Sequence, residues 1–138
     1  MRQQRGVLRP RGPRNPGSRP TQTARARGIT ISFDGNYRAL LWESWDSDPR
    51  AVLTKLVGCA DILFGNHRDV ALLLDRDLAG EGEDRRRNAA DAAFNAFPQL
   101  RLIASTARHV VTSDEHRLSA RVDTREAHAQ TDEIILSG

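Results

Sequence analysis

Short apolar runs alternate with helix-forming stretches along this 138-residue chain, and this alternation constrains the fold more than any other feature. Residues 29–33 include three β-branched residues and one aromatic residue, a composition that predicts a strand. Residues 61–64 and 100–104 are short apolar runs of the kind buried in parallel sheets. Because helical patterns separate these runs, the order strand, helix, strand, helix, helix, strand predicts an α/β fold with helices packed on a parallel sheet.

The ends of the predicted helices carry recognisable signals. Asp48 and Pro49 are typical of an N-cap and a first helical residue, and Gly58 ends the apolar face of that helix. Gly65 and Asn66 turn the chain into a second helix that reaches residue 74. A third is predicted to be capped by Asp84 and ended by Pro98, and the following side chains share one of its faces: Ala89, Ala90, Ala93, Phe94, Ala96 and Phe97.

Both ends of the folded part have weaker patterns. Residues 24–28 read as the end of a helix with Gly28 as its glycine cap. Residues 109–112 and 116–122 are predicted to pair as antiparallel strands across a turn at 113–115. Residues 134–136 begin a further apolar element. We place a polar, solvated loop between residues 75 and 84.

The first 22 residues are rich in Arg, Pro and Gly and have little to bury, so we expect them to be disordered. Residues 1–27 hold eight arginines and no acidic residue, whereas the rest of the chain has 13 basic and 18 acidic side chains. The basic charge therefore belongs to the tail. One alternative function is nucleic-acid binding by this tail through phosphate charge alone, since it lacks aromatic side chains for base stacking.

Several protein classes are excluded by composition. Cys59 is the only cysteine, so an internal disulfide cannot form, and no apolar run is long enough to span a membrane. The N-terminus has no apolar signal core, and the cytoplasm is the expected compartment. The histidines lack the spacing of metal ligands, and Trp42 and Trp45 are interpreted as covering the core.

Three polar clusters follow the predicted strands, at residues 34–38, 65–69 and 105–108. The carboxyl ends of parallel strands meet at one edge of a sheet, and ligands of open α/β sheets bind at that edge. We therefore expect these three loops to line one site.

These clusters resemble a known family. The segment Phe33-Asp34-Gly35-Asn36-Tyr37-Arg38 with Leu41-Trp42 resembles the F-D-x-N-Y-R…L-W segment of PfkB/ribokinase-type carbohydrate kinases, with the 2-dehydro-3-deoxygluconokinase branch most similar. Residues 61–69 resemble that family's strand and N-x-x-E motif, and residues 97–108 its next strand and nucleotide-side loop. The resemblance covers residues 23–136 and implies a partial kinase domain over 23–138, with a truncated ribokinase-like three-layer αβα sheet.

The resemblance also implies roles for single residues. Arg38 would clamp the carboxylate of a sugar acid, which suits a planar guanidinium, and Asn36 and Tyr37 would shape the pocket wall. Asn66 and Asp69 would order water and Mg²⁺ near the phosphates of ATP. Thr106 and Arg108 would face those phosphates. Two structural alternatives stay open: Arg38 as a surface turn residue, and Asn66 with Asp69 as a helix capping box.

Two segments of the family have no counterpart in the sequence. One is the G-x-G-D segment, whose Asp is the catalytic base and whose amides stabilise the transferred phosphoryl group; we expect it beyond Gly138. The other is the N-terminal half with the lid. The implied parent reaction transfers the γ-phosphoryl group of ATP to the primary hydroxyl of 2-dehydro-3-deoxygluconate, and we expect a truncated gene product without turnover of its own. A remnant without function is the other alternative, and the oligomeric state stays open.

Overall fold

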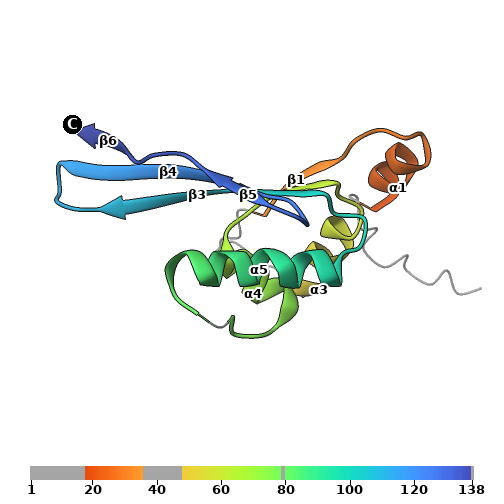
Figure 1. The fold of residues 1–138 in the computed structure, drawn as a ribbon. Helices are drawn as coiled ribbons and strands as arrows, with labels where there is room; N and C mark the ends of the chain where they lie inside the picture. The colour runs from red at the N-terminus through yellow and green to blue at the C-terminus, as the bar shows by residue number, and fades with distance from the viewer. Residues whose placement is uncertain (1–17, 36–47, 79, 138) are drawn as a thin grey trace, which may run out of the picture.

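A computed structural model describes residues 18–35, 48–78 and 80–137 of the chain. Figure 1 shows a twisted sheet with helices beneath it. The central strands are β1 (Ser32–Asp34), β2 (Ile62–Phe64) and β3 (Leu102–Val110), which pair in parallel in that order. Three helices connect them: α3 (Pro49–Val57), α4 (His67–Leu74) and α5 (Gly82–Ala96). The predicted α/β alternation is confirmed.

The second half of the sheet is antiparallel. Strand β4 (Glu115–Asp123) pairs with β3 over eight residue pairs, from Ile103 opposite Asp123 to Val110 opposite His116. Strands β5 (His128–Gln130) and β6 (Ile134–Ser137) then both pair with β4, along different parts of its length. The predicted hairpin is therefore confirmed but is longer than expected. The apolar element predicted at residues 134–136 lies in β6.

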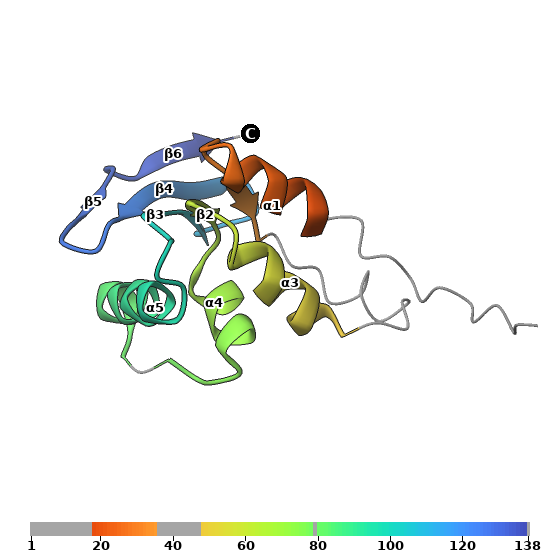
Figure 2. The same ribbon diagram turned by 90° about the vertical axis from the view of Figure 1, so that its right-hand side faces the viewer.

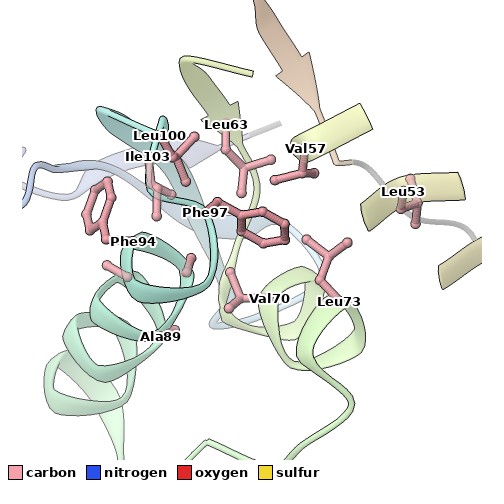
Figure 3. Close-up of a cluster of buried hydrophobic side chains, with 12 residues drawn as sticks. Leu53, Val57, Leu63, Val70, Leu73, Ala89, Phe94, Phe97, Leu100 and Ile103 are labelled. Carbon is pink, nitrogen blue, oxygen red and sulfur yellow. The ribbon is translucent and has the colours of Figure 1, made fainter. Parts of the chain in front are cut away.

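Helices α3, α4 and α5 lie side by side on one face of the sheet (Figure 2). Leu63 and Ile103 point from the strands into this layer and are buried, and Phe94, Phe97 and Leu100 meet them from α5 and the segment after it (Figure 3). The described residues thus supply one helix layer of the predicted three-layer arrangement, and the apolar core lies between that layer and the sheet.

The opposite face of the sheet is more exposed. Strand side chains alternate between faces, so Phe64 points away from Leu63, and it is 49 % exposed whereas Leu63 is fully buried. The strand register places Ala104, Thr106 and Val122 on the same side as Phe64. We call this side the open face; Phe64, Ala104, Thr106, Ala120 and Val122 define it.

The helix termini follow from local chemistry. The Asp48 carboxylate accepts hydrogen bonds from the backbone amides of Arg50 and Ala51, which confirms the predicted N-cap of α3. Helix α1 spans Ser18–Ala26, and Gly28 stops it two residues later with a φ of +71°, which suits glycine. The Ile29 amide donates to the Ala24 carbonyl and the Gly28 amide to the Arg25 carbonyl, the Schellman pattern.

Three sequence expectations about helices were wrong in detail. Helix α1 begins at Ser18, so the last five residues of the tail expected to be disordered are helical; residues 1–17 lie outside the described ranges. Helix α5 begins at Gly82 and not after Asp84, because positive φ angles at Gly80 and Gly82 turn the chain earlier. Ala96 is exposed, and Ala92 is buried in its place.

A long-range contact joins the end of α5 to the turn after β4. The Arg125 guanidinium donates to the carbonyls of Phe94, Phe97, Pro98 and Leu100 at distances of 2.7–3.3 Å. It also stacks over the Phe94 ring, 5.1 Å from the ring centre. One side chain therefore binds a carbonyl group in the last turn of α5 and three in the segment that follows it.

In the described ranges, no helix is long and apolar enough to cross a membrane.

Candidate functional site

The carboxyl ends of β1 and β2 meet at one edge of the sheet. The Gly35 amide donates to the Phe64 carbonyl at 2.7 Å, and the Gly65 amide donates to the Ala104 carbonyl at 2.9 Å. A side chain at Gly35 would approach that Phe64 oxygen to 3.3 Å, so the close approach of the two loops favours glycine there. The starts of two of the three predicted loops, at Gly35 and Gly65, are therefore neighbours, while residues 36–38 of the first loop lie outside the described ranges.

The third predicted loop is wrong. Residues 105–108 belong to β3, which continues past the parallel part of the sheet because its outer half pairs with β4. Thr106 and Arg108 lie opposite Ala120 and Leu118 in this ladder. Thr106 nevertheless lies two residues beyond Ala104, the last residue of β3 paired with β2, and so stays close to the edge.

Asn66 and Asp69 form a complete capping box at the start of α4. The Asn66 side-chain oxygen accepts from the backbone amides of Arg68 and Asp69, and the Asp69 carboxylate accepts from the Asn66 amide at 2.8 Å. The structural reading of this pair is confirmed. The helix end thus uses Asn66 Oδ1 and Asp69 Oδ2. No cluster of three metal-ligating side chains exists among the described residues.

A cavity of about 510 Å³ opens at this edge, and we call it the rim cavity. It is lined by Asp34, Asp69 and the Gly65-Asn66 turn on one side and by Thr106 and the open face of β4 on the other. The cavity thus brings Asn66, Asp69 and Thr106 together, as the sequence predicted. The predicted sugar contacts Asn36, Tyr37 and Arg38 lie outside the described residues, as do Trp42 and Trp45; Gly35, at this edge, directly precedes them.

A second cavity, of about 250 Å³, lies on the helix-covered side of β3 and shares the Gly65-Asn66 turn with the first. Its lining includes Arg68, Arg86 and Arg108, and we call it the arginine cavity. Arg108 is among the residues that line this cavity, but the alternation along β3 places its side chain on the open face, as for Thr106. Arg86 was not predicted as a lining residue, because its place in the cavity depends on how α5 packs beside α4.

Asp123, which lines the arginine cavity, belongs to a buried charge network. The Arg121 guanidinium donates two hydrogen bonds to the Asp123 carboxylate, at 2.9 and 3.0 Å, and both side chains are at least 96 % buried. Arg87 adds a third contact to Asp123 at 3.3 Å. The hydrogen bonds that Arg121 donates to Asp123 raise the pKa of Arg121 despite the opposing effect of burial. Its residue types could have been noticed in the sequence, but the pairing of α5 with β4 could not.

The pKa of His67 reflects the charges around the start of α4. Burial lowers the pKa of its imidazole, and the neighbouring charges of Arg68, Arg85 and Arg86 lower it further, while Asp69 acts in the opposite direction. Since cations dominate among the charges around His67, the edge of α4 that faces α5 is electropositive. The rim cavity differs, because its lining includes the carboxylates of Asp34 and Asp69.

No protein-family model matches the sequence, and no curated protein matches it significantly. Solved structures do match. A PfkB family carbohydrate kinase from Listeria grayi superposes with a TM-score of 0.70 at 24 % identity, over 85 % of this chain and 34 % of that one. The 2-dehydro-3-deoxygluconokinase of Thermotoga maritima gives 0.73 at 20 % identity, over 85 % and 35 %.

Fructokinase from Xylella fastidiosa with bound ATP is more distant, with a TM-score of 0.53 at 19 % identity, over 80 % of this chain and 30 % of that one. The chain thus spans about a third of the length of the structures it matches. Its ribokinase-like α/β fold is that of one segment of the PfkB-family carbohydrate kinases.

Proposed function

We propose that this chain is a segment of an ATP-dependent carbohydrate kinase of the PfkB type and that the edge with the rim cavity is its ligand-binding part. The observation that carries the proposal is the cavity itself. It opens at the carboxyl ends of adjacent parallel strands, where ligands of α/β sheets bind, and it joins Asn66, Asp69 and Thr106. The shared fold with kinases, one of them solved with bound ATP, supports the same assignment.

The nucleotide contacts in this proposal come from Asn66, Asp69, Thr106 and Arg108. The Thr106 hydroxyl is exposed on β3 and can donate a hydrogen bond to a phosphate oxygen. Mg²⁺, when bound with ATP, would neutralise phosphate charge, and we propose that Asn66 and Asp69 contact it through water, since the capping box already uses Asn66 Oδ1 and Asp69 Oδ2. Arg108, two residues beyond Thr106 on the same face of β3, would reach the phosphates from the outer end of that strand.

The sugar contacts in this proposal come from Asn36, Tyr37 and Arg38, with Arg38 paired to a carboxylate. The acceptor would be a sugar acid such as 2-dehydro-3-deoxygluconate, phosphorylated on its primary hydroxyl. The sequence contains no G-x-G-D segment to take the hydroxyl proton. We therefore expect the purified chain to bind ligands without phosphoryl transfer.

Calorimetric titration with ATP tests the nucleotide half. We expect saturable binding that Thr106→Val weakens by about tenfold, because one charge-assisted hydrogen bond is lost. Thr54→Val, an exposed change on α3 far from the cavity, is the matched control and should leave the affinity unchanged. Equal effects of both variants, or no saturable binding, would contradict the assignment.

Titration with 2-dehydro-3-deoxygluconate and with neutral fructose tests the sugar half. We expect the sugar acid to bind more tightly, and Arg38→Gln to remove that preference while leaving ATP binding intact. A coupled kinase assay on the same sample should give no turnover, and steady turnover would overturn that part of the proposal. Removal of residues 1–22 tests the alternative of nucleic-acid binding, since RNA or DNA affinity should then disappear only under that alternative.

A further inference from the structure

The arginine cavity lies on the other side of β3 from the open face, between the start of α4 and the first half of α5. Its walls are polar where they meet solvent and apolar deeper, where Val70, Ala89, Ala90 and Ile103 close it against the core. At about 250 Å³ it has room for a small anion and a few waters, but not for a whole nucleotide.

The two arginines that reach this cavity from α4 and α5 have no carboxylate partner. Neither Arg68 nor Arg86 forms an ion pair within the described ranges, and Arg86 makes a single long hydrogen bond to Gln130 at 3.4 Å. Other arginines of the chain are paired: Arg25, Arg50, Arg87 and Arg117 each reach a carboxylate. Guanidinium groups gathered without counter-charge favour an anion between them.

Asp123 is the one acidic side chain lining the cavity among the described residues, and it does not cancel this charge. Its carboxylate is already bound by Arg121 and Arg87. The amides of Arg68 and Asp69 at the start of α4 are also occupied, because they donate to the Asn66 side chain. These two amides are therefore not available to an anion, and the arginine side chains are the donors that we consider.

We propose that the arginine cavity binds a phosphate group, with Arg68 and Arg86 as its guanidinium donors and Ser105 as a hydroxyl donor. Two planar guanidinium groups offer paired N–H donors that match phosphate oxygens, which single ammonium groups cannot do. The phosphate is either free inorganic phosphate or the end of a nucleotide that reaches over the Gly65-Asn66 turn from the rim cavity. The site does not depend on the proposed kinase function, since free phosphate alone would fill it.

Titration of the full chain with inorganic phosphate at constant ionic strength tests the site. We expect saturable binding that Arg68→Gln and Arg86→Gln each weaken by about tenfold. Arg101→Gln is the matched control, because it removes the same charge from a 68 % exposed side chain next to the opposite end of β3, and it should change the affinity by less than about twofold. Circular dichroism and thermal melting of each variant verify that it is folded.

Equal weakening by all three variants would mean that phosphate responds only to net charge, and the site would be refuted. Absence of saturable binding to the wild-type chain would refute it as well. ATP titrated into the phosphate-loaded chain distinguishes the two sources: competition sensitive to Arg86→Gln identifies a nucleotide phosphate, and independent binding identifies free phosphate. Phosphate binding without ATP binding would leave this site standing while the proposed kinase function fails.

Discussion

The two faces of the sheet differ although neighbouring residues build them. Leu63 is fully buried under α4 and α5, and Phe64, the next residue of β2, is 49 % exposed on the open face. Asp123 and Val122 of β4 repeat the contrast, at 3 % and 37 % exposure. Both β2 side chains are apolar, as in strands that are covered on both sides. Strand β2 therefore has the composition of a strand buried on both faces. The described residues, however, cover only one of its faces.

The buried ion pair on the covered face gives the largest expected effect. We expect Asp123→Ala to lower the free energy of unfolding by about 4 kcal/mol, because Arg121 would stay buried without its partner. Val122→Ala, one residue away on the open face, should cost about 0.5 kcal/mol. Urea unfolding followed by circular dichroism measures both, and similar losses would break the contrast between the faces.

Leu63 and Phe64 of β2 allow the covered and open faces to be compared with apolar side chains. Leu63→Ala should cost about 3 kcal/mol, since it leaves a cavity in the packed core, and Phe64→Ala should cost less than about 1 kcal/mol. The same unfolding measurement applies. A large loss for Phe64→Ala would mean that the open face is buried in solution, and analytical ultracentrifugation of the two variants would then identify self-association as the cause.

The capping box lies where the two faces meet and has an intermediate expected effect. Asn66→Ala should cost about 1 kcal/mol, because the amides of Arg68 and Asp69 lose their acceptor. Asn95→Ala, on the exposed side of α5, is the control and should be close to neutral. No loss for Asn66→Ala would mean that water replaces the cap without cost.

The smallest expected effect is the pH dependence of His67. Its pKa is lower in the folded chain than the ordinary value of 6.5, so the unfolded chain binds the proton more readily. Its contribution to stability should be present above pH 6.5 and be lost as the pH falls through the lowered folded pKa. The free energy of unfolding of wild type and His67→Gln, compared across pH, isolates the contribution of His67. In a separate NMR titration, the pKa of His67 should rise when phosphate is added. A pKa that stays unchanged would weaken the case for an anion beside Arg68 and Arg86.

Local chemistry could be predicted from the sequence where it is contained in a few consecutive residues. The Asp48 cap, the Asn66–Asp69 capping box and the Gly28 stop all depend on neighbours within five positions. The closeness of the loops at Gly35 and Gly65 also followed, because parallel strands bring their carboxyl ends together.

The rest depended on contacts distant in sequence. Residues 105–108 were expected to form a loop because their polar composition suits one, but hydrogen bonds to β4 hold them as strand. Arg86 enters the arginine cavity only because α5 packs beside α4, and Asp123 is buried only because Arg121 and Arg87 converge on it. Periodicity within a segment carries no information on such partners.

The two ways in which α1 and α5 end have a consequence for the order of folding. Helix α1 is closed by hydrogen bonds among residues 24–29, so its terminus can form as soon as that stretch is made. The last turn of α5 depends on Arg125, about thirty residues further along the chain. Amide hydrogens at the end of α5 should therefore acquire protection from exchange together with those of the β4–β5 turn, as one cooperative unit, while those of α1 exchange independently.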